Sequence, residues 1–263
     1  RPPRSTLFPY TTLFRSGHAI DFVRMHDGCS FQEAVAKLLG GEQGQTFRSA
    51  SERNAEPQKL FALPLPHHNM RRVYAYLMKQ RHIDRDIITH FARAGTLYED
   101  AKYHNAVFVG TDEHGVSRHA QKRSTNSQGK SFKLNVAGSD ARYSFHHLGD
   151  DGDLYVFEAP IDLLSYITLH PENWQQHSYV ACCGTSYEPV RWILTRMEAP
   201  QMVSLCLDHD NAGDQGCERM AKQISSEFGF PTRRLVPEQK DWNEDLCALR
   251  EAPRRQRMEM EMR

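Results

Sequence analysis

The chain has 263 residues, of which 39% are hydrophobic and 25% are charged, and its formal net charge is zero. This length and composition are typical of a globular protein with one large or two small domains. No apolar run approaches the roughly 20 residues that a transmembrane helix needs, which excludes a spanning protein. With no net charge, any nucleic-acid partner must be bound by a local basic patch.

The first residues look foreign to the rest of the chain. Residues 5–16 resemble a common sequencing adapter translated in one frame, and the chain does not begin with Met. We therefore expect residues 1–16 to be non-native and the chain to be a fragment of a protein that starts further upstream. The alternative is a native basic leader, such as a signal peptide.

Two short helices are predicted within residues 17–41. Apolar residues from Ala19 to Val23 fit the first. Ser30 and Glu33 form a capping box that starts the second, which should end at Gly40-Gly41. Residues 42–69 are rich in Gln, Ser, Glu and Pro and lack periodicity, so they indicate a linker.

Two more helices and a set of short strands are predicted next. Val73, Tyr76 and Leu77 mark one face of a helix from Arg71, and a second helix runs from Ile83 to Ala94. The turn residues 111–115 predict a hairpin over 106–120. The β-prone runs in this region are 97–98, 106–110, 116–120, 132–134 and 143–145.

Basic residues concentrate between Arg118 and Lys133, with Ser, Asn and Gly among them. This pattern predicts a flexible basic loop that contacts nucleic-acid phosphates. The alternative is a solvated hairpin tip. The candidate nucleic-acid-binding residues are Arg118, Lys122, Arg123, Lys130, Lys133 and Arg142.

Strands and helices alternate from Asp153 onward. The expected strands are 154–157, 178–183, 202–207 and 231–236, and the expected helices are 161–169, 187–197, 214–228 and 241–249. Such alternation predicts an α/β fold with a parallel sheet and helices on both faces. A small α+β domain precedes it.

Carboxylates follow two of these strands. Glu158 comes after the first strand, and Asp208 and Asp210 come after the third. Because the carboxyl ends of parallel strands meet at one edge, these side chains should gather into a site for Mg²⁺ or Mn²⁺. We assign all three as catalytic metal ligands for phosphoryl-transfer chemistry, with Glu158 completing the metal site or serving as general acid or base. The alternative for Asp208-x-Asp210 is loop capping.

Residues of a second group are expected near this site. Asp162, in a first helical turn, either orients the site or is simply a carboxylate that the helix dipole stabilises. Gly184 either allows a close backbone approach or forms a plain turn. Asp241 and Glu244 also fit a capping box. The complete secondary set is Asp162, Gly184, Asp214, Lys240, Asp241 and Asn243.

The order of Glu158, Gly184 and Asp208-x-Asp210 after successive strands resembles the Toprim domain of primases, topoisomerases and some nucleases. Segments 157–165, 207–213 and 240–244 are similar to the Toprim branch of primase-like proteins from plasmids and mobile elements. In that branch an uncharacterised domain precedes Toprim and ends with a Gly-Ser-Asp-Lys-like element, here Gly138–Phe145 with Ala141 in place of the Lys. Residues 17–41 resemble the end of the zinc-ribbon domain of DnaG-type primases.

The resemblance covers roughly residues 71–249 and implies a primase-like, Mg²⁺-dependent nucleotidyltransferase. Such an enzyme would act on single-stranded DNA in plasmid or mobile-element replication, with nucleotides as substrates and a replicative helicase or relaxase as candidate partner. The alternatives are a Toprim nuclease that cleaves phosphodiesters and a non-catalytic DNA-binding accessory. Zinc is expected only in the missing upstream domain, and no His pairs with another His or Cys at a metal-binding spacing.

None of the six cysteines forms a Cys-x-x-Cys pair, which indicates free thiols and a reducing, cytoplasmic location. No contact with a membrane is expected.

The expected organisation of the chain has six parts. The parts are the adapter-like segment 1–16, the zinc-ribbon remnant 17–41, the linker 42–69, the basic α+β domain 70–150, the Toprim domain 151–250 and the tail 251–263.

Overall fold

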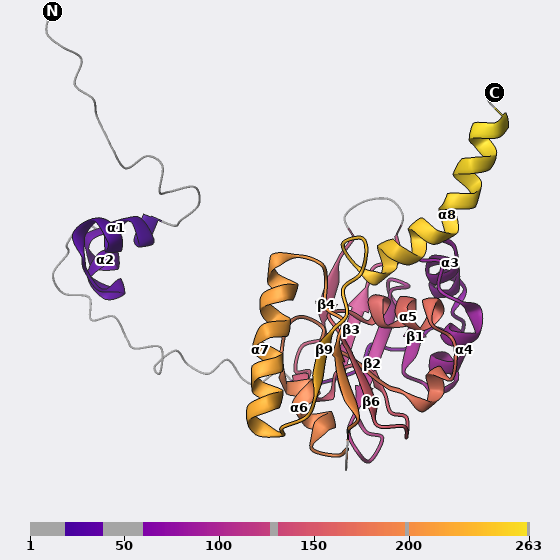
Figure 1. The fold of residues 1–263 in the computed structure, drawn as a ribbon, viewed down its shortest axis with the longest axis horizontal. Helices are drawn as coiled ribbons and strands as arrows, with labels where there is room; N and C mark the ends of the chain where they lie inside the picture. Colours follow the sequence, from indigo (N-terminus) through magenta and orange to yellow (C-terminus); the bar gives the residue numbers. More distant parts are fainter. Residues whose placement is uncertain (1–18, 39–59, 127–130, 198–199, 262–263) are drawn as a thin grey trace, which may run out of the picture. The chain divides into compact units, whose positions relative to one another are not determined.

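A computed structural model of the chain describes residues 19–38, 60–126, 131–197 and 200–261. The adapter-like segment, Gly40-Gly41, most of the linker and Lys130 lie outside these residues. The chain divides into two compact units, residues 1–57 and 58–263 (Figure 1). Within the described ranges, no helix is both long and apolar enough to cross a membrane.

The first unit contains helices α1 (Ala19–Asp27) and α2 (Phe31–Leu38). Glu33 Oε2 accepts the backbone N–H of Ser30 at 2.8 Å, and Ser30 Oγ accepts the N–H of Glu33 at 3.4 Å. These reciprocal bonds confirm the predicted capping box.

The second unit begins with helices α3 (Arg71–Lys79) and α4 (Arg85–Arg93). The Asp84 side chain caps α4 by accepting the N–H of Asp86, and Gly95 follows the helix with a φ of +74°. Both predicted helices are confirmed, although α4 starts later than expected.

An antiparallel sheet follows in the order β1-β2-β3-β4. Its strands are β1 (Leu97–Glu99), β2 (Ala106–Thr111), β3 (Ser117–Arg123) and β4 (Lys133–Asn135). The predicted hairpin is confirmed. The prediction of a loop from Arg118 onward is wrong, because β3 stays paired with β2 as far as the register pair Ala106↔Arg123.

The strand predicted at 143–145 is also wrong. The chain instead forms a short helical turn, η2 (Ala141–Tyr143), because the Asp140 carboxylate accepts the N–H of Arg142 at 3.0 Å. The strand β5 (His146–His147) comes just after it.

The second sheet has the order β5-β7-β6-β8-β9, and β7, β6, β8 and β9 run parallel. The four parallel strands are β6 (Asp153–Phe157), β7 (Ser178–Ala181), β8 (Met202–Leu205) and β9 (Thr232–Arg234). The connecting elements are α5 (Pro160–Leu169), η3 (Trp174–Gln176), α6 (Glu188–Leu194), α7 (Asn211–Glu227) and α8 (Trp242–Glu261).

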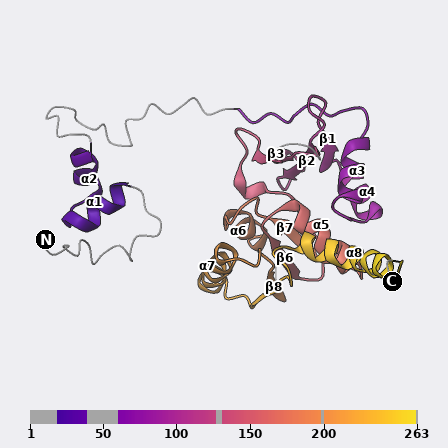
Figure 2. The same ribbon diagram turned by 90° about the horizontal axis from the view of Figure 1, so that it is seen from above.

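Helices cover both faces of this sheet, as predicted (Figure 2). Side chains alternate along β6, so that Leu154 and Val156 join the core under α6 and α7, whereas Tyr155 and Phe157 join the core under α5 and α8. The core under α5 and α8 also includes residues of α3, α4, β1 and β2. This core is therefore continuous between the two sheets and joins the α+β part to the α/β part. Helix α8 continues well past the predicted end at Leu249.

Candidate active site

A cavity of about 200 Å³ lies at the carboxyl ends of the parallel strands, against the antiparallel sheet. One wall carries acidic residues and helix starts of the α/β part, and the other carries basic residues of the α+β part. The polar lining residues are Arg81, Gln121, Arg123, Lys133, Glu158, Asp162, Asp208, Lys240, Asp241 and Asn243.

Glu158 and Asp162 come from the turn between β6 and α5. Pro160 stands at the first position of α5, where its missing N–H has no cost, and Asp162 follows in the first turn. The Asp162 side chain is buried. The Glu158 carbonyl accepts the N–H of Gly184 at 3.1 Å, which ties this turn to the end of β7. Gly184 has a φ of +143°, a conformation that favours glycine.

Asp208 begins a tight turn that leads from β8 into α7. Asp210 caps α7, its carboxylate accepting the N–H of Gly213 at 2.9 Å. A Cβ atom on Gly213 would lie 2.1 Å from the Asp208 carbonyl oxygen, so only glycine fits there. Arg234 donates to the same carbonyl oxygen at 2.9 Å. The backbone of Asp208 is therefore fixed from two sides.

The start of α8 closes the cavity. Asp241 caps this helix by accepting the N–H of Glu244 at 2.8 Å, and the Lys240 carbonyl accepts the N–H of His209 at 2.7 Å. Trp242 donates its indole N–H to the Cys206 carbonyl at 2.8 Å. These bonds hold Asp241 beside the end of β8.

Crowding of carboxylates shifts their protonation. Burial, followed by the charges of Glu158 and Asp241, raises the pKa of Asp208 to about 6. Burial, with the charges of Asp241 and Asp208, also raises the pKa of Asp162 well above its ordinary value. The raised pKa values show that the negative charges of these carboxylates are concentrated in one partly desolvated region, where a cation would be favoured.

The basic wall comes from the α+β part. Lys133 Nζ lies 3.3 Å from Glu158 Oε1, and its charge lowers the pKa of Asp208. Arg123 is the register partner of Lys133 on the neighbouring strand, and both Arg123 and Arg81 donate to the Tyr76 hydroxyl. Arg81 was missed in the sequence because it is an isolated cation at the end of a helix.

Several predicted residues lie elsewhere. Arg118 pairs with Asp112 at 2.7 Å and Arg142 pairs with Asp140 at 2.6 Å, so their charges are already partnered. Lys122 alternates with Arg123 along β3 and therefore points to the opposite face of the sheet.

Two predicted carboxylates do not line the cavity. Asp214 pairs with Arg234 at 3.1 Å. Asp210 is exposed at the start of α7 and is absent from the residues that line the cavity, although its charge still raises the pKa of Asp208. Among the described residues, Asp162 and Asp241 line the cavity, whereas Asp210 and Asp214 do not.

The donor set suits a hard divalent cation. All the acidic donors are carboxylate oxygens, as Mg²⁺ prefers. Among the described residues, no three of these carboxylates bring oxygens within 4.8 Å of one another. An ion held by one or two carboxylates, with waters and substrate phosphates as the remaining ligands, requires no such cluster.

Two known families match the chain. Residues 75–151 match a family described as a protein of unknown function, DUF3991, and residues 155–246 match the family described as Toprim-like. The chain thus carries a Toprim-like domain preceded by a DUF3991 domain, as the resemblance implied.

Individual proteins are similar to this chain over most of its length. The uncharacterized protein pXO2-78 of Bacillus anthracis is 28% identical over 251 residues, which cover 88% of this chain and 73% of that protein. The primase fragment of the bacteriophage T7 primase-helicase protein has a TM-score of 0.50 at 18% identity, covering 65% of this chain and 68% of that one. The E. coli primase catalytic core has a TM-score of 0.48 at 16% identity, covering 69% of each chain. The first of these two structural likenesses shows a shared fold.

Proposed function

We propose that this chain, in which a DUF3991 domain precedes a Toprim-like domain, is a primase-type nucleotidyltransferase. It would use Mg²⁺ or Mn²⁺ to join nucleotides on single-stranded DNA, in the cytoplasm, during replication of a plasmid or another mobile element. The observation that carries the proposal is the cavity in which an acidic sheet edge faces a basic wall. The relative named after pXO2, a Bacillus anthracis plasmid, supports the mobile-element setting.

The carboxylates would hold the metal. Glu158 and Asp208 follow neighbouring parallel strands and line the same cavity. The charge of Asp241 raises the pKa of Asp208, and the charge of Asp208 in turn raises the pKa of Asp162. We assign Glu158 and Asp208 as direct ligands and Asp210, at the turn beside them, as a ligand reached through water. When bound, the ion would neutralise phosphate charge and polarise the reacting phosphate.

The basic wall would bind the substrate. Lys133, Arg123 and Arg81 line the same cavity as the carboxylates and can neutralise a nucleoside triphosphate or a DNA backbone. Lys240 adds a fourth cation on the acidic side. We assign template and nucleotide contacts to these four residues and not to Arg118 or Arg142, which do not line the cavity.

The proposal is tested with single-stranded DNA, labelled ribonucleotides or deoxynucleotides and Mg²⁺, on wild type and Asp208→Asn. Template-dependent synthesis that the variant loses supports a primase. DNA degradation without synthesis, again lost in the variant, would identify a nuclease instead. DNA binding that is equal in both proteins, with no turnover, would identify an accessory protein. A replicative helicase or relaxase added to the assay tests the candidate partners.

A further inference from the structure

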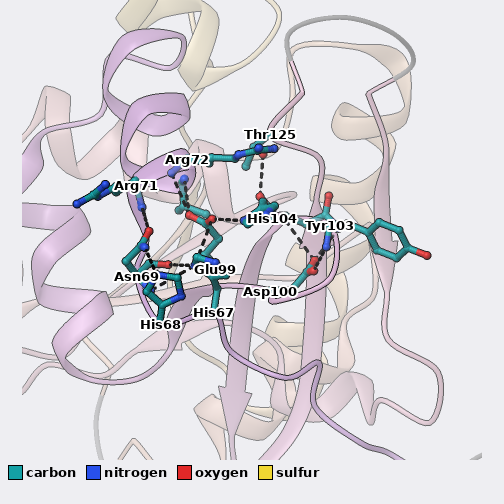
Figure 3. A network of polar contacts seen from close by, with 12 residues as sticks. His67, His68, Asn69, Arg71, Arg72, Glu99, Asp100, Tyr103, His104 and Thr125 are labelled. Carbon is teal, nitrogen blue, oxygen red and sulfur yellow. Dashed lines mark hydrogen bonds and ion pairs between the residues drawn. The ribbon is translucent and has the colours of Figure 1, made fainter.

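Glu99, at the end of β1, is a buried carboxylate that faces two histidines from other parts of the chain. His67 precedes α3, and His104 lies in the turn between β1 and β2 (Figure 3). One ligand atom from each of the three residues lies within 4.8 Å of the others. We propose that His67, Glu99 and His104 form a binding site for a transition-metal ion of the Zn²⁺ class.

The Glu99 carboxylate is held in place from one side. Its side chain is 1% exposed, and Oε2 accepts the backbone N–H groups of Arg72 at 3.0 Å and Val73 at 3.1 Å, at the start of α3. Oε1 therefore faces the two imidazoles, 2.6 Å from His104 Nδ1 and 3.9 Å from His67 Nδ1. Hydrogen bonds of this kind to the second oxygen orient a metal-binding carboxylate.

His104 Nδ1 is hydrogen-bonded to Glu99 Oε1, and His67 Nδ1, which also contacts the Asn69 carbonyl at 3.0 Å, lies 3.9 Å from the same oxygen. The ring centroids of the two histidines are 4.7 Å apart at an interplanar angle of 66°. His104 has a φ of +58°, which is uncommon for any residue other than glycine. The N–H of His104 donates to the Asp100 carbonyl at 3.1 Å, and its carbonyl accepts from Thr125 Oγ1 at 2.8 Å. The fold thus maintains a strained backbone that points His104 at Glu99.

Asp100, the neighbouring carboxylate, is not available as a fourth ligand. Its oxygens accept the N–H groups of Lys102, Tyr103 and Asn105 and the Asn105 side chain. Three protein ligands with a position left for water or another small ligand is a coordination that zinc adopts in proteins.

Ligand chemistry separates this site from the cavity described above. Imidazole nitrogen with one carboxylate suits Zn²⁺ and related ions, whereas an all-carboxylate site suits Mg²⁺. The proposed ion would join three segments. Residues 64–67 already contact this region through the bonds Tyr98 Oη to Pro64 O, Ala101 N to Leu65 O and His67 N to Glu99 O. The ion would lock that segment to β1 and to the start of α3.

The test uses the full chain, stripped of metal with a chelator and then titrated with Zn²⁺ or Co²⁺. His67→Gln and His104→Asn each remove one ligand, and Asn is chosen at position 104 because it tolerates a positive φ. His177→Gln is the control, since it removes a histidine from the other three-residue cluster, formed with Asp151 and Asp153. Circular dichroism of the metal-free proteins checks that each variant is folded.

Wild type and His177→Gln should bind Zn²⁺ with equal affinity, with Co²⁺ giving the visible absorption of a four-coordinate site. His67→Gln and His104→Asn should bind at least about 100-fold more weakly, since even outer-shell changes cost 10–100-fold. Equal binding by all four proteins, or a loss confined to His177→Gln, would overturn the proposal. If His104→Asn does not fold, the comparison of wild type with His67→Gln decides the question.

Discussion

Asn243 is predicted to be one of the strongest links between the two parts of the second unit, and replacing it by Ala tests this. This residue is 2% exposed. Nδ2 donates to the Arg81 carbonyl and to Ser165 Oγ, each at 2.9 Å, and Oδ1 accepts from Arg81 Nη1 at 2.9 Å. Asn243→Ala would remove the hydrogen bonds that the Arg81 carbonyl and Arg81 Nη1 make with Asn243. Ser165 Oγ would still donate to the Ile161 carbonyl at 2.8 Å.

Asn243→Ala removes three hydrogen bonds, each with a net worth of about 1 kcal/mol, so it should lower the free energy of unfolding by about 3 kcal/mol. For a unit of this size, that loss lowers Tm by about 6–12 °C. Urea and thermal denaturation measure both quantities. Asn211→Ala is the control, because Asn211 is exposed and its loss should cost less than about 0.5 kcal/mol. A cost below about 1 kcal/mol for Asn243→Ala would refute the assigned role.

Three further predictions concern the cavity. Asp208 has its pKa raised to about 6 in the fold, so the folded protein keeps a proton there that the unfolded chain loses near pH 4, and stability falls as pH rises between these values. Asp208→Asn should therefore raise the free energy of unfolding by about 1–3 kcal/mol near neutral pH, with no gain below about pH 4. Denaturation curves of wild type and variant that coincide at neutral pH as well as at about pH 4 would contradict this. Lys133 lowers the pKa of Asp208, so Lys133→Met should shift the acidic limb of the pH–activity profile to higher pH, and an unmoved limb would argue against this contact. Gly213→Ala would place a Cβ 2.1 Å from the Asp208 carbonyl oxygen, and should lower stability by about 1–3 kcal/mol and abolish activity, whereas a fully active variant would show that the turn can relax.

The architecture of residues 153–249 could be predicted from the sequence because its signals are local. Each apolar run is followed by a helix start, as at Pro160, Asp210 and Asp241, and the alternation of strands and helices predicts a parallel sheet. The strand order was not predicted, since periodicity does not report which strands are neighbours. The wrong strand at 143–145 has a specific cause, because the Asp140 side chain competes for the backbone of Arg142.

The candidate site was only partly predictable. Carboxylates at strand ends, such as Glu158 and Asp208, could be recognised because sheet geometry brings strand ends together. Arg81 could not, because its place in the cavity depends on how α3 packs against α8. The pairing of Arg118 with Asp112 was missed for a similar reason: hairpin register, not composition, brings them together. His67, Glu99 and His104 lack motif spacing and meet only in the folded chain.

We propose that nucleotide transfer takes place in the cavity between the acidic edge and the basic wall. Incorporation of labelled nucleotides on single-stranded DNA tests it most directly, in a comparison of wild type with Arg123→Gln and Arg118→Gln. Both arginines lie on β3, but only Arg123 lines the cavity. Mg²⁺-dependent synthesis should fall about 100-fold or more in Arg123→Gln and stay near the wild-type level in Arg118→Gln. Equal activity of the two variants, at any level, would contradict it.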